Sequence, residues 1–98
     1  MLVRIVKLTF KKENITSFER IFAETQQKIL GFGGCALLEL YQDINNPAIF
    51  FTYSHWESTK FLDDYRQSDL FRETWSKTKV LFDAKPEAWS ISKKNRVD

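Results

Sequence analysis

Three segments of the chain carry apolar residues at both even and odd positions, namely residues 2–10, 32–42 and 48–56. Strict alternation is typical of a strand with one solvated face, whereas this mixed pattern predicts strands that are covered on both faces. The second and third segments are joined by DINNPA, a turn-forming sequence, so we expect them to form an antiparallel hairpin. AWSIS at residues 88–92 predicts a short last strand.

Helical spacing follows the first predicted strand. Thr16 with Glu19 three residues later fits a capping box, and Gly31 fits the left-handed residue that often ends a helix. The apolar face of this helix is predicted to consist of Phe18, Ile21, Phe22, Thr25 and Ile29.

Two further helical pieces follow the hairpin. Ser58 is the candidate N-cap of a short helix that carries Tyr65, and Ser68 is the candidate N-cap of a longer one. Pro86 is predicted to end this helical region. The inward stripe of the longer helix is predicted to contain Phe71, Trp75, Thr78 and Phe82.

The predicted order of elements is β-α-β-β-α-β with a split second helix. This order is typical of the ferredoxin-like α+β fold, in which helices cover one face of a four-stranded antiparallel sheet. We therefore predict one domain over residues 1–98. The uncovered face would be apolar, and a large exposed apolar patch favours association, so a homodimer through this open sheet face is expected.

Composition narrows the classes of function. The chain has 98 residues, of which 43% are hydrophobic, and its formal net charge of +2 is too balanced to predict a nucleic-acid-binding protein. A basic stretch at residues 93–98 is expected to be a flexible solvated tail. The one cysteine, Cys35, rules out an intrachain disulfide and is expected to be a small buried apolar residue. No signal peptide or membrane span is predicted, so a cytoplasmic protein is expected.

The segment HWES followed by FLDDYRQSDLFRETW resembles the antibiotic biosynthesis monooxygenase (ABM) family, which has a Trp-x-Ser corner after the third strand and a Ser-Asp helix start. The resemblance implies a dimeric α+β barrel. It also implies either cofactor-free oxidation of quinols or polyketide aromatics by O₂, or haem degradation; other members of the family have no assigned activity.

The haem-degrading branch of that family uses an Asn, a Trp and an iron-ligating His at three positions. The resemblance places Val6, Tyr65 and Trp75 at those positions. An indole nitrogen is a donor only and cannot ligate iron, so haem degradation of that kind is not expected. No cofactor and no metal site are predicted.

The candidate substrate-binding residues are Arg4, Val6, Tyr65 and Trp75. Tyr65 and Trp75 could stack a planar substrate or simply fill the core, and Arg4 could hold a phenolate or carboxylate or pair with Asp64. The lone His55 is a candidate catalytic base, but it has no orienting partner in the sequence, so a structural role stays open. Trp56 is interpreted as a buried corner residue.

Two functions remain open at this level. The first is a cofactor-independent monooxygenase acting on a small aromatic or quinol substrate. The second is a non-catalytic domain, ligand-binding or stress-associated, that keeps the fold and lacks catalytic groups.

Overall fold

A computed structural model describes residues 1–96 and confirms the predicted ferredoxin-like α+β fold. No helix in this part of the chain is both long enough and apolar enough to cross a membrane. Residues 93–96 of the predicted tail are exposed and lack regular structure, and residues 97–98 lie outside the described part. The elements are β1 (Leu2–Thr9), η1 (Lys12–Asn14), α1 (Ile15–Leu30), β2 (Cys35–Gln42), β3 (Ile49–Trp56), α2 (Thr59–Arg66), α3 (Asp69–Lys79) and β4 (Glu87–Ile91).

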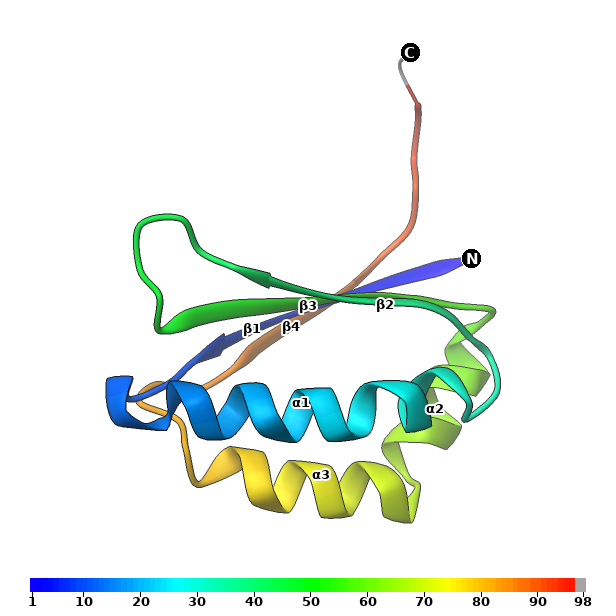
Figure 1. Cartoon of the computed structure of the whole chain (residues 1–98). Coiled ribbons are helices and arrows are strands. Elements are labelled where there is room, and N and C mark those ends of the chain that lie inside the picture. Colours follow the sequence, from blue (N-terminus) through cyan, green and yellow to red (C-terminus); the bar gives the residue numbers. More distant parts are fainter. Residues whose placement is uncertain (97–98) are drawn as a thin grey trace.

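The four strands form one antiparallel sheet in the order β2-β3-β1-β4. Figure 1 shows α1 and α3 beneath one face of this sheet, with α2 at the end where β3 leaves it. Successive residues of a strand point to opposite faces, so the pairing register decides which side chains meet the helices. On the helix-covered face, Arg4 lies between Ser54 and Ser90, and Val6 lies between Thr52 and Ala88.

The other face of the sheet carries no helix, and we call it the open face. Its cross-strand rows mix apolar and charged side chains, because Lys7 lies between Phe51 and Glu87. Nζ of Lys7 is 3.9 Å from Oε2 of Glu87. The open face is therefore less uniformly apolar than the sequence pattern predicts. Its large apolar members are Val3, Ile5, Leu37, Tyr41, Ile49, Phe51, Tyr53, Trp89 and Ile91.

The predicted ends of the first helix are wrong. Asn14 is the N-cap and makes no side-chain capping hydrogen bond, so Thr16 lies inside the helix and not at its cap. Gly31 has right-handed backbone angles (φ −82°, ψ −2°). The left-handed positions are Gly33 (φ 105°) and Gly34 (φ 89°), where the chain turns toward β2. A Cβ on Gly34 would lie 2.4 Å from Cβ of Phe61, so this close approach requires glycine.

The third helix begins as predicted but ends earlier. Its N-cap is Ser68, whose Oγ accepts a hydrogen bond from the backbone N–H of Phe71 at 3.1 Å. The helix ends at Lys79 and not at Pro86, so Phe82 lies outside it. Phe82 instead forms an isolated β-bridge with Phe10, and the two rings stack with centroids 5.2 Å apart.

Two clusters of buried side chains hold the helices against the sheet. The first is centred on Leu8, Phe10, Phe18 and Phe50. The second is centred on Ile29, Trp56 and Leu62. Trp56 is 2% exposed and its indole N–H donates to Ser54 Oγ at 3.0 Å, which agrees with a structural role as a buried corner residue.

Candidate functional site

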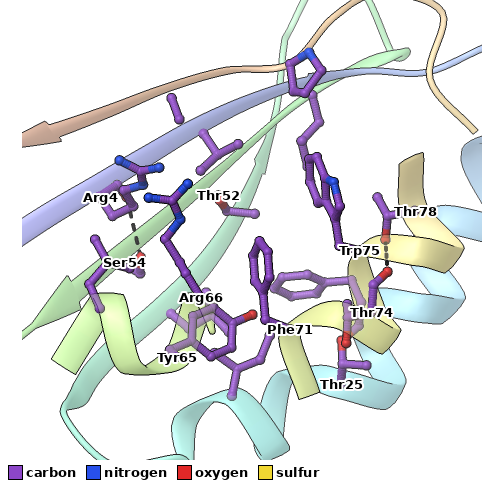
Figure 2. A pocket seen from close by; sticks show the side chains of 18 of the residues that line it. Arg4, Thr25, Thr52, Ser54, Tyr65, Arg66, Phe71, Thr74, Trp75 and Thr78 are labelled. Atoms are coloured by element: carbon purple, nitrogen blue, oxygen red, sulfur yellow. Dashed lines mark hydrogen bonds between the residues drawn. The ribbon is translucent and has the colours of Figure 1, made fainter. Parts of the chain in front are cut away.

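A cavity of about 360 Å³ lies between the helix-covered face of the sheet and the three α-helices. Its floor includes the small side chains of Thr52, Ser54 and Ala88. Trp75 packs against the first core cluster and Tyr65 against the second, so the cavity spans the gap between the two. Small floor residues between two well-filled clusters leave the space open. We refer to this space as the main cavity (Figure 2).

Four of the five candidate residues from the sequence line the main cavity. They are Arg4 and Val6 on β1, Tyr65 on α2 and Trp75 on α3. The fifth, His55, lies on the open face of the sheet and borders a second cavity together with Tyr53. Within one subunit the sheet therefore separates His55 from a molecule in the main cavity.

Aromatic rings form one wall of the main cavity. The rings of Phe71 and Trp75 are almost parallel, with an interplanar angle of 9° and centroids 5.9 Å apart. Tyr65 meets Phe71 edge to face at 5.3 Å and stacks on the buried Trp56 at 5.1 Å. This packing fixes the directions of the three cavity-lining rings and leaves flat apolar surface for a planar molecule.

Two polar atoms on this aromatic wall have no partner. Neither the Tyr65 hydroxyl nor the Trp75 indole N–H forms a hydrogen bond with any residue in the described range 1–96. Burial, and to a lesser extent the nearby Cys35 thiol, raises the pKa of Tyr65 to about 12, so the phenol stays protonated and remains a donor at neutral pH. In contrast, the hydroxyl of Thr78 donates to the carbonyl of Thr74 at 2.7 Å.

Two guanidinium groups stand at one end of the main cavity, where Figure 2 shows Arg4 and Arg66 side by side. Arg4 Nη1 donates to Ser90 Oγ at 2.9 Å. Partial burial, and then repulsion from Arg66, lowers the pKa of Arg4, while the Asp63 carboxylate opposes this only in part. The alternative pairing of Arg4 with Asp64 does not occur.

The carboxylate of Asp64 is held elsewhere. It forms a salt bridge with Lys60, whose Nζ lies 3.0 Å away and one helical turn earlier on α2. Spacing of four residues on one helix face explains this local pair, which takes the acid away from the cavity.

Sequence reasoning missed Arg66, although a signal was present. Arg66 follows the buried Leu62 by four residues, so it lies on the same helix face as an inward residue. Alternation along β3 likewise places Thr52 and Ser54 on the face of the buried Trp56.

Neither the lone histidine nor the lone cysteine belongs to a reactive cluster among residues 1–96. One ring nitrogen of His55 lies 3.1 Å from the Tyr53 hydroxyl, so the histidine has a hydrogen-bond partner after all. Cys35 is half-buried, and burial raises the pKa of its thiol, which agrees with an apolar packing role. The same residues contain no group of His, Cys, Asp and Glu side chains that could hold a metal ion.

Comparison with protein families agrees with this architecture. The sequence profile of the antibiotic biosynthesis monooxygenase family matches residues 1–76. The chain belongs to this family. The resemblance carried by HWES and by the Ser-Asp helix start is thereby confirmed for the ABM domain.

Solved structures with the same fold resemble this ABM domain over nearly its whole length. A conserved protein from Methanosarcina mazei Go1 is 26% identical, with a TM-score of 0.89 and coverage of 96% of this chain and 94% of the other. An antibiotic biosynthesis monooxygenase is 18% identical, with a TM-score of 0.91 and coverage of 97% and 100%. A protein from Pseudomonas aeruginosa is 16% identical, with a TM-score of 0.85 and coverage of 96% and 94%. No curated protein matches the chain significantly.

The three positions that the haem-degrading branch uses fall together in this ABM domain. Val6, Tyr65 and Trp75, which the family resemblance places at those positions, all line the main cavity. No histidine or cysteine lines this cavity in the described part of the chain. Tyr65 is a possible axial ligand only as a phenolate, and its raised pKa disfavours that form.

Proposed function

We propose that this ABM domain is a cofactor-independent monooxygenase that oxidises a small electron-rich aromatic or quinol in the main cavity. The observation that carries the proposal is the combination of parallel aromatic rings with unpaired donors, the Tyr65 hydroxyl and the Trp75 indole N–H. The volume of the main cavity, about 360 Å³, lies at the lower end of the range of roughly 300–1,000 Å³ that small-molecule sites span.

The chemistry needs a substrate that forms a stabilised anion. A quinol loses a phenolic proton and an anthrone loses a proton from its activated CH₂ group, and either anion is delocalised over the aromatic system and passes one electron to O₂. In the anthrone case the substrate radical and superoxide combine to a peroxide anion, which takes up a proton; loss of water then leaves C=O, so one oxygen atom enters the product and the other leaves as water. In the quinol case the semiquinone passes its remaining electron and proton to superoxide, and uptake of the first proton gives a quinone and H₂O₂. Donors fixed on the cavity wall favour the anion and the developing oxyanion.

The wall of the main cavity supplies donors and cations but no base. No carboxylate or imidazole lines it among the described residues, and the high pKa of Tyr65 keeps the phenol protonated. The substrate proton therefore leaves to water. The positive charge of Arg4 and Arg66 lowers the pKa of a bound acid, which suits a substrate that ionises readily.

We also propose that the ABM domain is a homodimer through the open face, because ABM domains are commonly dimeric. Trp89 and Ile91 on this face are each 45% exposed, and Tyr41 is 52% exposed. Covering these side chains would remove apolar surface from water. A small domain buries a smaller fraction of its accessible surface on folding than a large domain does. Association through the open face would therefore stabilise the fold as well.

Oxygen uptake tests the activity. The purified protein is incubated with a panel of naphthoquinols and an anthrone, and we expect uptake above the uncatalysed rate with at least one of them. Ala88→Phe fills the floor of the main cavity and removes no contact, so it should lower the rate at least about tenfold. Ala23→Phe, on the exposed side of α1, is the matched control and should leave the rate unchanged.

The absence of a base favours a second candidate function, a ligand-binding domain without catalysis. In that case the same aromatic compounds raise the melting temperature of the wild-type protein but not of Ala88→Phe, and oxygen uptake stays at the uncatalysed rate. Uptake that Ala88→Phe does not change would contradict catalysis in the main cavity. A Soret band on titration with haem would contradict the exclusion of haem.

A further inference from the structure

The charge distribution in the main cavity indicates the class of its ligand more specifically than the aromatic wall does. The guanidinium of Arg4 comes from β1 and that of Arg66 from the last turn of α2, and both line the same cavity. Their side chains lie next to each other in Figure 2, beside Ser54 and on the side of the cavity away from Trp75. The cavity is therefore cationic at one end and aromatic at the other.

No carboxylate within residues 1–96 forms a salt bridge with either guanidinium. The Arg66 side chain also makes no hydrogen bond within this range. Arg4 donates one N–H to Ser90 Oγ, and a guanidinium carries five N–H groups, so further donors remain for a ligand. Repulsion between the two groups exceeds the attraction that Asp63 supplies to Arg4. An anion between the two arginines would relieve this repulsion.

We propose that the main cavity selects an aromatic carboxylate, with its ring against Phe71 and Trp75 and its carboxylate between Arg4 and Arg66. Because the arginines present several coplanar N–H groups, they match the two oxygen atoms of a carboxylate better than the single oxygen of a neutral phenol. Arg66 is exposed, so the charged end of the ligand faces the cavity mouth while the ring lies inside. The inference rests on the proposed use of this cavity as a substrate site, and it adds the substrate class.

The test compares two ligands of nearly equal shape. Binding of 2-naphthoate and of its neutral carboxamide, 2-naphthamide, is measured by quenching of tryptophan fluorescence and by calorimetry. We expect the wild-type protein to bind 2-naphthoate at least about tenfold more tightly than the amide, because the carboxylate offers two anionic oxygens to the two cations whereas the amide offers one neutral oxygen.

Variants assign this preference to the two arginines. Arg66→Met changes an exposed side chain and should bring the affinities for the two ligands to within about twofold, because it weakens binding of 2-naphthoate far more than binding of 2-naphthamide. Arg4→Met should act in the same direction. Arg20→Met, on the exposed side of α1, is the matched control and should keep the full preference.

Equal affinities of the wild-type protein for the two ligands would overturn the inference, as would a carboxylate preference that survives in both Arg66→Met and Arg4→Met. Oxygen uptake with 1,4-dihydroxy-2-naphthoate and with its carboxamide separates this result from the proposed activity. Uptake that is equal with the two compounds contradicts the inference and supports the activity. Arginine-dependent binding of 2-naphthoate without uptake supports the inference and contradicts the activity.

Discussion

Tyr65 links the core of the domain to its main cavity. One side of its ring stacks on the buried Trp56, and its edge meets Phe71, so the phenol is held in one orientation. Figure 2 shows its hydroxyl turned toward Phe71 inside the cavity. A side chain fixed in this way can present its O–H to a ligand oxygen without losing much conformational entropy on binding.

The raised pKa of Tyr65 predicts a loss of stability at high pH. Between the ordinary value of 10 and about 12, the unfolded chain ionises this phenol while the folded chain keeps its proton, so the free energy of unfolding falls as pH rises. At pH 11 this loss amounts to about 1 kcal/mol. Tyr65→Phe removes it, so urea unfolding at pH 8 and pH 11 should show a smaller decrease for the variant than for the wild-type protein. Equal decreases would contradict a buried, protonated Tyr65.

Ser68 joins two helices that both line the main cavity. Its hydroxyl donates to the carbonyl of Tyr65 at 2.6 Å and accepts from the backbone N–H of Phe71 at 3.1 Å. The end of α2 and the start of α3 are therefore tied through one side chain. The cavity residues Tyr65 and Phe71 are kept in contact by this tie.

Ser68→Ala should lower the free energy of unfolding by about 1 kcal/mol, the typical effect of losing an N-cap side chain. For a domain of this size that corresponds to a decrease in melting temperature of roughly 4–8 °C. Ser58→Ala is the matched control, because Ser58 occupies the N-cap of α2 but makes no side-chain capping hydrogen bond. Calorimetry of the two variants should give a clearly larger decrease for Ser68→Ala, and equal decreases would contradict the capping role.

The existence of these elements could be predicted from the sequence, because apolar spacing and Ser68 are local signals. The ends of α1 could not be predicted so well. A 3₁₀ turn precedes this helix and moves its N-cap to Asn14, and the left-handed residue is set by the approach of Gly34 to Phe61. That approach joins residues far apart in the chain, which no local pattern contains.

The candidate site was predictable to a similar extent. Helical spacing placed Tyr65 and Trp75 on the inward side, and strand alternation placed Arg4 with Val6. The proximity of Arg4 and Arg66 depends on the tertiary arrangement of α2 relative to β1, which no local sequence pattern contains. The separation of His55 from these residues follows from strand alternation, but its meaning becomes clear only once the cavity is located.

The domain has two different faces. The helix-covered face encloses the main cavity, whereas the open face presents half-exposed aromatic and aliphatic side chains beside the second cavity, which His55 and Tyr53 border. The Lys7 and Glu87 pair marks one edge of the open face. A twofold arrangement of two open faces would cover the apolar rows and leave both main cavities accessible from the helix side.

The proposed dimer predicts that Phe51→Glu converts the protein to a monomer. Phe51 lies on the open face between Tyr41 and Lys7 and is partly buried within the subunit. Association would remove the remaining exposed part of its ring from water, whereas a buried carboxylate opposes association. Light scattering after size exclusion should give half the wild-type mass. Trp89→Glu tests the same face from the strand at its edge, so the result does not depend on the folding of one variant. Val80→Glu, which is 70% exposed and follows α3, is the matched control and should stay dimeric. A dimer that persists in both open-face variants would show that the subunits associate through another surface.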